Sequence, residues 1–216
     1  MVPEKSSAKV AACLARILRA GLLTVLAAVA GFADTPVTPN ASPEAQALLA
    51  YFHDVSGKQM LSGQQEGWRG TNELGFELQH IQQHTGKLPA VLGLDAMNLT
   101  SGWRGRRAEG RHPAFQAALD WYLKRNGIVT FCWHWYAPVG QRAFYTKETD
   151  FDAARAVTPG TPEYAGVVRD LDAVAEQLKL LQAAQVPVLW RPLHEANGRW
   201  FWWGAAGPEA CKKIWR

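Results

Sequence analysis

The chain has 216 residues, of which 48% are hydrophobic and 19% are charged. This length suits one ordinary domain or part of a larger one, and the composition can bury a core, which excludes a disordered tail. All ten tryptophans follow residue 67, so they belong to the folded part. An exposed tryptophan commonly stacks on a sugar and a buried one fills a core, and both uses remain open.

The first 33 residues have the pattern of a targeting segment. Four basic residues lead into a short apolar run, residues 21–33, that ends in small side chains. The run is too short to cross a bilayer in the ordinary way, and its end suits a cleavage site. We expect a signal peptide over residues 1–33 and a secreted or periplasmic protein without stable membrane insertion. An uncleaved anchor or a mitochondrial presequence is the alternative.

The charge of the chain gives no sign of a nucleic-acid partner. The formal net charge of +4 falls to about +1 without residues 1–33, which hold four basic residues and one acid. No basic stripe remains to bind phosphates. Cys132 and Cys211 have no CxxC spacing, and the histidines are scattered, so we expect no metal and no cofactor. A disulfide between these cysteines is permitted, but a buried free thiol suits the apolar run around Cys132 better.

The remaining elements alternate along the chain. A proline-rich leader, residues 34–41, precedes a helix predicted over residues 42–57, with Ser42 as its N-cap and Pro43 in its first position. A first apolar run (59–65) and an amphipathic helix (72–86) come next. The pattern then repeats three times. Apolar runs at 89–97, 127–135 and 186–195 are followed by helices predicted over residues 112–127, 161–185 and 207–216. Strands that alternate with helices predict an α/β fold with a parallel sheet.

Two architectures fit this order, a doubly wound open sheet and a (β/α)8 barrel. No glycine-rich phosphate loop follows the first strand, which weakens the nucleotide-binding version of the open sheet. Polar and aromatic residues gather where the apolar runs end, and this end of the strands is the active-site face of a barrel. Four βα units are half of a barrel, which typically needs about 250 residues.

Glu195 is the first candidate catalytic residue. It follows the apolar run "VPVLW" where a strand should turn into a loop, next to His194 and near Asn197. Partial burial beside tryptophan rings raises the pKa of a carboxylic acid, which suits a general acid at neutral pH. His194 could bind a substrate hydroxyl or steady the glutamate. The plainer interpretations are a surface or helix-capping glutamate and a structural histidine.

Aromatic residues cluster at two strand ends. Residues 200–203 are all aromatic, and because they cannot all face one ligand, we expect one or two to stack on a sugar and the others to pack. Trp133, His134 and Trp135 repeat the theme after the third apolar run. His134 could bind a hydroxyl, whereas Trp133 and Trp135 are expected to divide between the pocket and the core.

The stretch "RPLHEANGRWFWWG", residues 191–204, resembles the signature of glycoside hydrolase family 26, whose members are mostly endo-β-1,4-mannanases. The family pattern reads His-Glu-Met-Asn-Gly and then Trp-Phe-Trp-Trp-Gly, and here Ala196 replaces the methionine. "LSGQQEGW", "PAVLGLDAM" and "VTFCWHW" look like the family's first three strand ends. The resemblance covers residues 42–216, which we interpret as a catalytic domain.

The resemblance implies a (β/α)8 barrel that hydrolyses β-1,4-mannosidic linkages with retention, as a monomer acting on a polysaccharide. It implies that Glu195 is the proton donor, that His194 supports the catalytic site and that Trp200 is an active-site aromatic. The candidate substrate-binding residues are His134, Trp200, Trp133, Asp95 and Asn197. A retaining glycosidase needs two carboxyls about 5–5.5 Å apart, one to protonate the leaving oxygen and one to attack the anomeric carbon.

The family's nucleophile ends the seventh strand, and only four strands are predicted here. We therefore expect the chain to be the N-terminal half of a mannanase and to be inactive by itself. Two alternatives stay open. One is another β-glycanase of the family, acting on β-1,3-xylan or mixed-linkage glucan. The other is a non-catalytic carbohydrate-binding protein, which the tryptophan content favours and the βα order opposes.

The targeting segment gives the first testable prediction. When the chain is expressed with export in a secreting bacterial host, the mature protein should begin near Asp34, because Gly31 and Ala33 suit a signal peptidase site. Intact-mass measurement of the exported protein checks the start. The variant Ala33→Leu should shift or block cleavage. An exported protein that keeps residues 1–33 would instead support an uncleaved anchor.

Overall fold

The structure is a computed structural model that describes residues 35–67, 74–100 and 112–216. It divides into residues 1–35 and residues 36–216, and every described helix and strand belongs to the second unit. The predicted signal peptide lies outside the described residues. In the described ranges, no helix is both long and apolar enough to cross a membrane.

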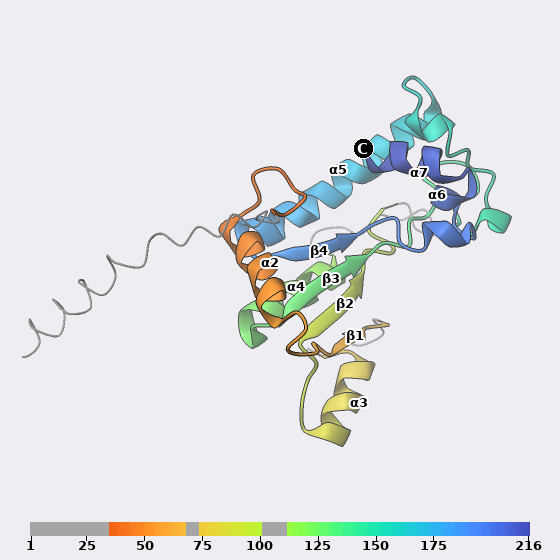
Figure 1. The fold of residues 1–216 in the computed structure, drawn as a ribbon. Coiled ribbons are helices and arrows are strands. Elements are labelled where there is room, and N and C mark those ends of the chain that lie inside the picture. The colour runs from red at the N-terminus through yellow and green to blue at the C-terminus, as the bar shows by residue number, and fades with distance from the viewer. Residues whose placement is uncertain (1–34, 68–73, 101–111) are drawn as a thin grey trace, which may run out of the picture. The chain divides into compact units, whose positions relative to one another are not determined.

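Four parallel strands form one sheet, in agreement with the predicted α/β class. They are β1 (Gly63–Gln65), β2 (Val91–Asp95), β3 (Ile128–Cys132) and β4 (Val188–Arg191). Their order across the sheet is the order of the chain, β1-β2-β3-β4 (Figure 1). A doubly wound sheet reverses its strand order at a switch point, whereas neighbouring barrel strands follow one another. The topology therefore favours the barrel.

The observed bounds of most helices agree with the predicted ones to within about two residues. They are α2 (Pro43–Val55), α3 (Phe76–Thr85), α4 (Pro113–Arg125), α5 (Pro162–Ala183), α6 (Trp202–Ala205) and α7 (Pro208–Trp215). Ser42 and Thr161 are side-chain N-caps of α2 and α5, because each accepts a backbone N–H of its helix. The helix predicted over residues 72–86 begins only at Phe76, and residues 72 and 73 lie outside the described residues.

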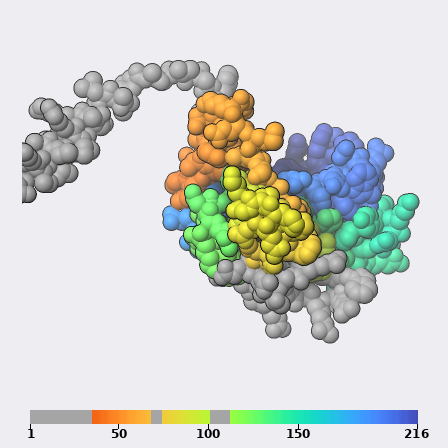
Figure 2. All heavy atoms as spheres, turned by 90° about the horizontal axis from the view of Figure 1, so that it is seen from below, coloured from red at the N-terminus to blue at the C-terminus, as the bar shows by residue number. Residues whose placement is uncertain are grey.

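The helices lie at different places around the sheet. In Figure 1, α2 crosses the end where the strands begin, and α6 lies beyond their arrowheads. α4 contacts β2, β3 and α5. α3 follows β1 and buries only Leu78, and its atoms are exposed in yellow in the space-filling view (Figure 2). The segment after β3 contains the turns η1 (Thr146–Glu148) and η2 (Arg155–Val157), and the segment after β4 contains η3 (Ala196–Gly198) and helix α6.

The two faces of the sheet have different roles. Side chains alternate along a strand, so Val129 and Phe131 of β3 point to one face and Thr130 and Cys132 to the other. Phe131 is fully buried and stacks on Phe115 of α4, with ring centroids 4.6 Å apart. The first face is therefore the helix-packed core, and the second bears the polar residues of the strand ends.

Two buried polar residues on α5 hold the loops at the carboxyl ends of the strands. Asp170 is 2% exposed and accepts the indole N–H of Trp135 at 3.0 Å. Gln177 accepts the backbone N–H of His112 through Oε1 at 3.0 Å. Because a buried polar group without a partner is costly, each bond fixes the loop that supplies its donor.

Packing of α4 on the sheet gives a stability prediction. Phe115→Ala should lower the free energy of unfolding by about 3–5 kcal/mol, since it empties a fully buried ring site against Phe131. Leu123→Ala is the matched control on the same helix, because Leu123 is 62% exposed, and it should change stability by less than about 1 kcal/mol. Urea unfolding monitored by circular dichroism measures both. Equal losses in the two variants would contradict the described packing.

Candidate active site

An open cleft of about 760 Å³ lies at the carboxyl ends of the strands. The strand register places Asp95 of β2 beside Cys132 of β3, and Cys132 beside Arg191 of β4. These three residues share the face opposite the helix-packed core. Loop residues complete the wall, which includes Gln65, Glu66, Met97, Asn98, His112, His134, His194 and Glu195.

Another cavity of similar volume, about 750 Å³, lies where the strands begin, against α2. Its lining includes Glu44, Lys124 and Arg125 but no histidine or cysteine. Of these two cavities, therefore, only the cleft at the carboxyl ends of the strands is lined by histidine and cysteine side chains.

Asp95 binds the end of β3 through both carboxylate oxygens. Its Oδ1 accepts the backbone N–H of His134 at 3.0 Å and that of Met97 at 2.9 Å. Its Oδ2 lies 2.5 Å from Nδ1 of the His134 ring. Burial opposes ionisation of Asp95, but the hydrogen bonds from His134 and Met97 outweigh it and hold the carboxyl pKa below its ordinary value. Asp95 is thus a carboxylate that orients His134.

His134 and His194 face each other across the cleft. The Nδ1 of His134 faces Asp95, and its Nε2 lies 3.4 Å from Nε2 of His194. Burial, and then the neighbouring His134, lower the pKa of His194 below its ordinary value. His194 is therefore neutral at neutral pH, and its Nε2–H can serve as the donor of this pair. Its Nδ1 is buried without a hydrogen-bond partner.

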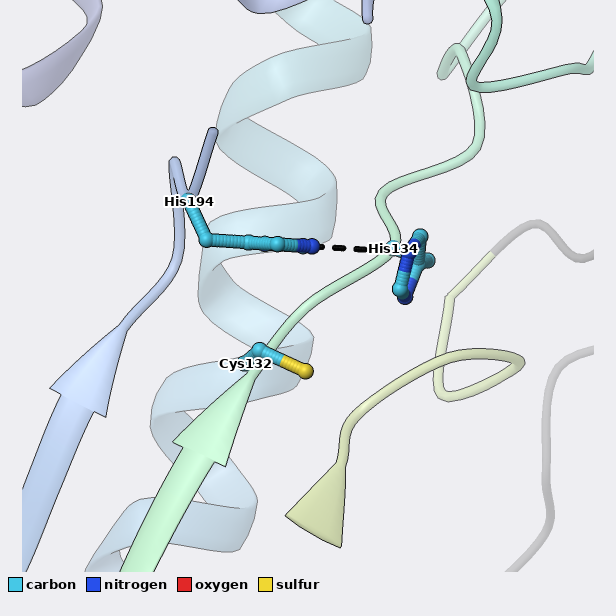
Figure 3. A group of neighbouring side chains, drawn as sticks. All are labelled: Cys132, His134 and His194. Atoms are coloured by element: carbon cyan, nitrogen blue, oxygen red, sulfur yellow. Dashed lines mark hydrogen bonds between the residues drawn. The ribbon is translucent and has the colours of Figure 1, made fainter. Parts of the chain in front are cut away.

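Cys132 lies beneath the two imidazoles. Figure 3 shows its thiol and the rings of His134 and His194 converging from the ends of β3 and β4. Burial, followed by the charge of Asp95, raises the pKa of the Cys132 thiol to about 12. Cys132 and Cys211 are both free, so the preference for a free thiol at Cys132 is confirmed.

Glu195 lies on the rim of the cleft. The predicted strand over residues 186–195 ends earlier, at Arg191, and Glu195 precedes η3 with a left-handed backbone, φ 56°. Its side chain is exposed, and its Oε2 accepts the indole N–H of Trp200 at 3.1 Å. Both His194 and Glu195 reach the cleft because the turn after β4 breaks the alternation of a strand.

The aromatic run after Glu195 divides into one exposed and three buried side chains, so the expected packing of the others is confirmed, while stacking of Trp200 on a sugar stays a prediction. Trp200 is 48% exposed, whereas Phe201, Trp202 and Trp203 are each at most 3% exposed. Trp202 donates its indole N–H to the Trp135 carbonyl at 2.7 Å, and Trp203 donates to the His194 carbonyl at 3.0 Å. The buried tryptophans thus fix the loop backbone, and Trp200 is left as the exposed aromatic beside Glu195.

Two predicted substrate-binding residues lie away from the cleft wall. Trp133 is 1% exposed and stacks on Trp135 with centroids 4.1 Å apart, next to Trp190. Trp133 and Trp135 lie against α5, and neither lines the cleft that contains His134. The expected division between pocket and core is wrong, because both side chains are 1% exposed and belong to the core. Asn197 lies in η3, is exposed and does not line the cleft.

Other cleft residues were not anticipated from the sequence. His112 precedes α4 and contacts the Met97 carbonyl through Nε2 at 3.1 Å. Arg191 and Cys132 join it on the wall. The period-two pattern of β3 and β4 could have indicated Cys132 and Arg191, since both share a face with His134 or Asp95. His112 lies in a loop, where no such periodicity applies.

Glu66 is a buried acid at the edge of the cleft. It is 5% exposed, its Oε1 accepts the Leu78 backbone N–H at 2.8 Å, and its Oε2 has no partner. Burial raises its pKa to about 7, and the adjacent acid Glu77 contributes in the same direction. Glu66 is therefore a carboxyl that keeps its proton to near neutral pH.

Comparisons with known proteins agree on one family. The family model described as Glycosyl hydrolase family 26 matches residues 37–216. A mannan endo-1,4-beta-mannosidase of Thermothelomyces thermophilus is 40% identical over 187 residues, covering 82% of this chain and 36% of that protein. Mannan endo-1,4-beta-mannosidase A of Piromyces sp is 40% identical over 188 residues, covering 84% and 30%. The chain spans about a third of the length of these curated relatives.

Solved structures of the family share the fold. The Podospora anserina GH26-CBM35 beta-(1,4)-mannanase is 43% identical with a TM-score of 0.71, over 82% of this chain and 40% of that one. A beta-mannanase from a symbiotic protist of the termite Reticulitermes speratus is 36% identical with a TM-score of 0.72, over 84% and 58%. The four βα units correspond to part of the family's (β/α)8 barrel, as the strand order indicated.

Glu66 gives a prediction on pH. A carboxyl whose pKa is raised by folding destabilises the folded state as pH rises, here from the ordinary value of 4.5 to about 7. The thermal midpoint of the native chain should therefore fall over this range. Glu66→Gln stays neutral and can donate to Glu77, so its midpoint should fall less. The exposed Glu209→Gln serves as control and should follow the native profile. Parallel profiles for Glu66→Gln and the native chain would contradict the assignment.

Proposed function

Because the chain belongs to glycosyl hydrolase family 26, we propose that it hydrolyses internal β-1,4-mannosidic linkages of mannan or galactomannan as part of a longer enzyme. The observation that carries the proposal is the carboxylate of Glu195 on the rim of the cleft, beside an exposed tryptophan. The curated relatives named mannan endo-1,4-beta-mannosidase support the choice of substrate. A carbohydrate-binding sandwich is not supported, because the described sheet is parallel.

Glu195 acts as the proton donor in this proposal. A retaining glycosidase protonates the leaving oxygen with one carboxyl, which then returns as a base to activate water. Its exposed position on the rim gives the glycosidic oxygen access to the carboxyl. The 3.1 Å bond from Trp200 to Oε2 leaves Oε1 to carry the proton toward substrate. Trp200 thus has two functions, since its exposed ring also offers a stacking surface.

The paired histidines bind the sugar hydroxyls. Asp95 fixes the tautomer and direction of His134, and His194 contacts His134 through Nε2. The two imidazoles can hydrogen-bond the hydroxyls of one sugar ring. Asn197 lies near Glu195 in η3 and adds an amide that could reach a sugar on the outer side of the rim.

The second carboxyl comes from elsewhere in the barrel. Among the described cleft acids, Asp95 is engaged with His134, and Glu66 is buried against the start of α3. We infer from these contacts that neither is the nucleophile. We therefore expect residues 1–216 alone to have no mannanase activity. Assay of this chain on galactomannan checks the expectation, and robust hydrolysis would refute it.

The role of Glu195 can be tested in an active barrel. A chimaera would carry residues 36–216 in place of the matched region of the Podospora anserina mannanase, to which they are 43% identical. In it, Glu195→Gln should lower kcat on galactomannan by about 10²–10⁴-fold, the usual contribution of a general acid. The exposed Glu148→Gln is the matched control and should keep full activity.

An activated substrate separates the role of the acid from a fold defect. Aryl mannosides with a good leaving group need little protonation, so Glu195→Gln should lose far less of the first chemical step on them. Loss of activity that is equal for both substrates would argue against a proton donor, and unchanged activity on galactomannan would exclude any catalytic role.

A further inference from the structure

The cleft brings together three side chains that are typical metal ligands. The thiol of Cys132 and ring nitrogens of His134 and His194 all lie within 4.8 Å of one another (Figure 3). They come from positions separated by up to 62 residues, so no ligand spacing marks them in the sequence. Thiolate with two imidazoles is a ligand set that suits borderline-soft cations such as Zn²⁺.

The spacing of the two imidazoles fits a tetrahedral ion. With Zn–N bonds of about 2.0–2.1 Å, tetrahedral geometry separates two nitrogens by about 3.3–3.4 Å. The two Nε2 atoms are 3.4 Å apart. A Zn–S bond of about 2.3 Å needs sulfur and nitrogen about 3.5–3.6 Å apart. Because the thiol and the ring nitrogens lie within 4.8 Å of one another, the thiol must approach the nitrogens by at most about 1.3 Å to reach this separation.

The surroundings also favour an ion. Asp95 accepts the Nδ1–H of His134, which is the carboxylate–histidine arrangement that orients metal-binding imidazoles and strengthens them as ligands. The cleft that these residues line is open, so an ion can enter from solvent. The carboxylates of Asp95 and Glu195 line the same cleft and offset the positive charge of Arg191.

We propose that Cys132, His134 and His194 bind one borderline-soft divalent cation, of which Zn²⁺ is the representative. Binding releases the thiol proton of Cys132 to water, and the His194 proton moves from Nε2 to Nδ1, so that three lone pairs face the ion. The fourth position is open to the cleft. Since the proposed function places a sugar against the same imidazoles, ion and sugar would exclude each other, and only this consequence rests on that function. The ion would then be a reversible inhibitor.

Cobalt provides the direct test, with the complete 216-residue chain. Co²⁺ bound by a thiolate gives an intense thiolate-to-cobalt absorption in the near ultraviolet, and excess Zn²⁺ should remove it. We expect one equivalent of Co²⁺ per chain with this band. Cys132→Ser should abolish the band, while Cys13→Ser and Cys211→Ser, the matched controls, should keep it. Because the reporter is ligation and not turnover, failure of the proposed mannanase activity would leave this result unaffected.

Affinity measurements test His194 as a ligand and Asp95 as the residue that positions His134. His194→Gln should weaken Co²⁺ binding more than tenfold, and Asp95→Asn, which only positions His134, should weaken it by about 10–100-fold. Circular dichroism shows whether each variant keeps its fold. A native chain that shows no thiolate band at saturating Co²⁺ would overturn the site without recourse to any variant. A band that survives in Cys132→Ser would overturn it as well.

Discussion

The carboxylate of Asp95 is the interaction on which the cleft depends. Three N–H groups converge on it, two from the residues that follow β2 and β3 and one from the His134 ring. A charged acceptor with three donors is among the stronger hydrogen-bond arrangements, and here it joins two strand ends at the point where the sheet stops. The direction of His134, the spacing of the two imidazoles and their position above Cys132 all follow from this junction.

The loop after β4 is held in place by the packing and hydrogen bonds of its buried aromatic residues. Phe201 and Trp203 stack at 4.5 Å, and the buried indoles of Trp202 and Trp203 each donate to a backbone carbonyl of the site. A loop that bears the proposed catalytic carboxyl needs such support, because a shift of about 1 Å in a catalytic group can cost about 10²-fold in rate. Most of the aromatic side chains near Glu195 therefore hold the loop in position, and the ring of Trp200 remains exposed.

The class of fold and the family could be predicted from the sequence, because the alternation of strands and helices and the motif at residues 191–204 are both local patterns. The α5 helix shows where the sequence was a poorer guide. Its apolar residues Val168 and Leu171 are 38% and 45% exposed, while its polar residues Asp170 and Gln177 are buried. Those polar residues are inside because they satisfy the loops of Trp135 and His112, a long-range need that helical periodicity does not express. The convergence of Cys132 with His194 was hidden for the same reason.

The left-handed backbone of Glu195 lowers the stability of the fold, while its side chain supplies the carboxyl on the rim of the cleft. A residue other than glycine in the left-handed region costs about 1 kcal/mol or more, and asparagine or glycine would adopt φ 56° more easily. An engineer who optimises this loop for thermal tolerance would be led to replace the glutamate, and would gain a sturdier protein that lacks its carboxyl. Stabilising substitutions should therefore avoid this turn and be made in the exposed helix α3 or in the proline-rich leader.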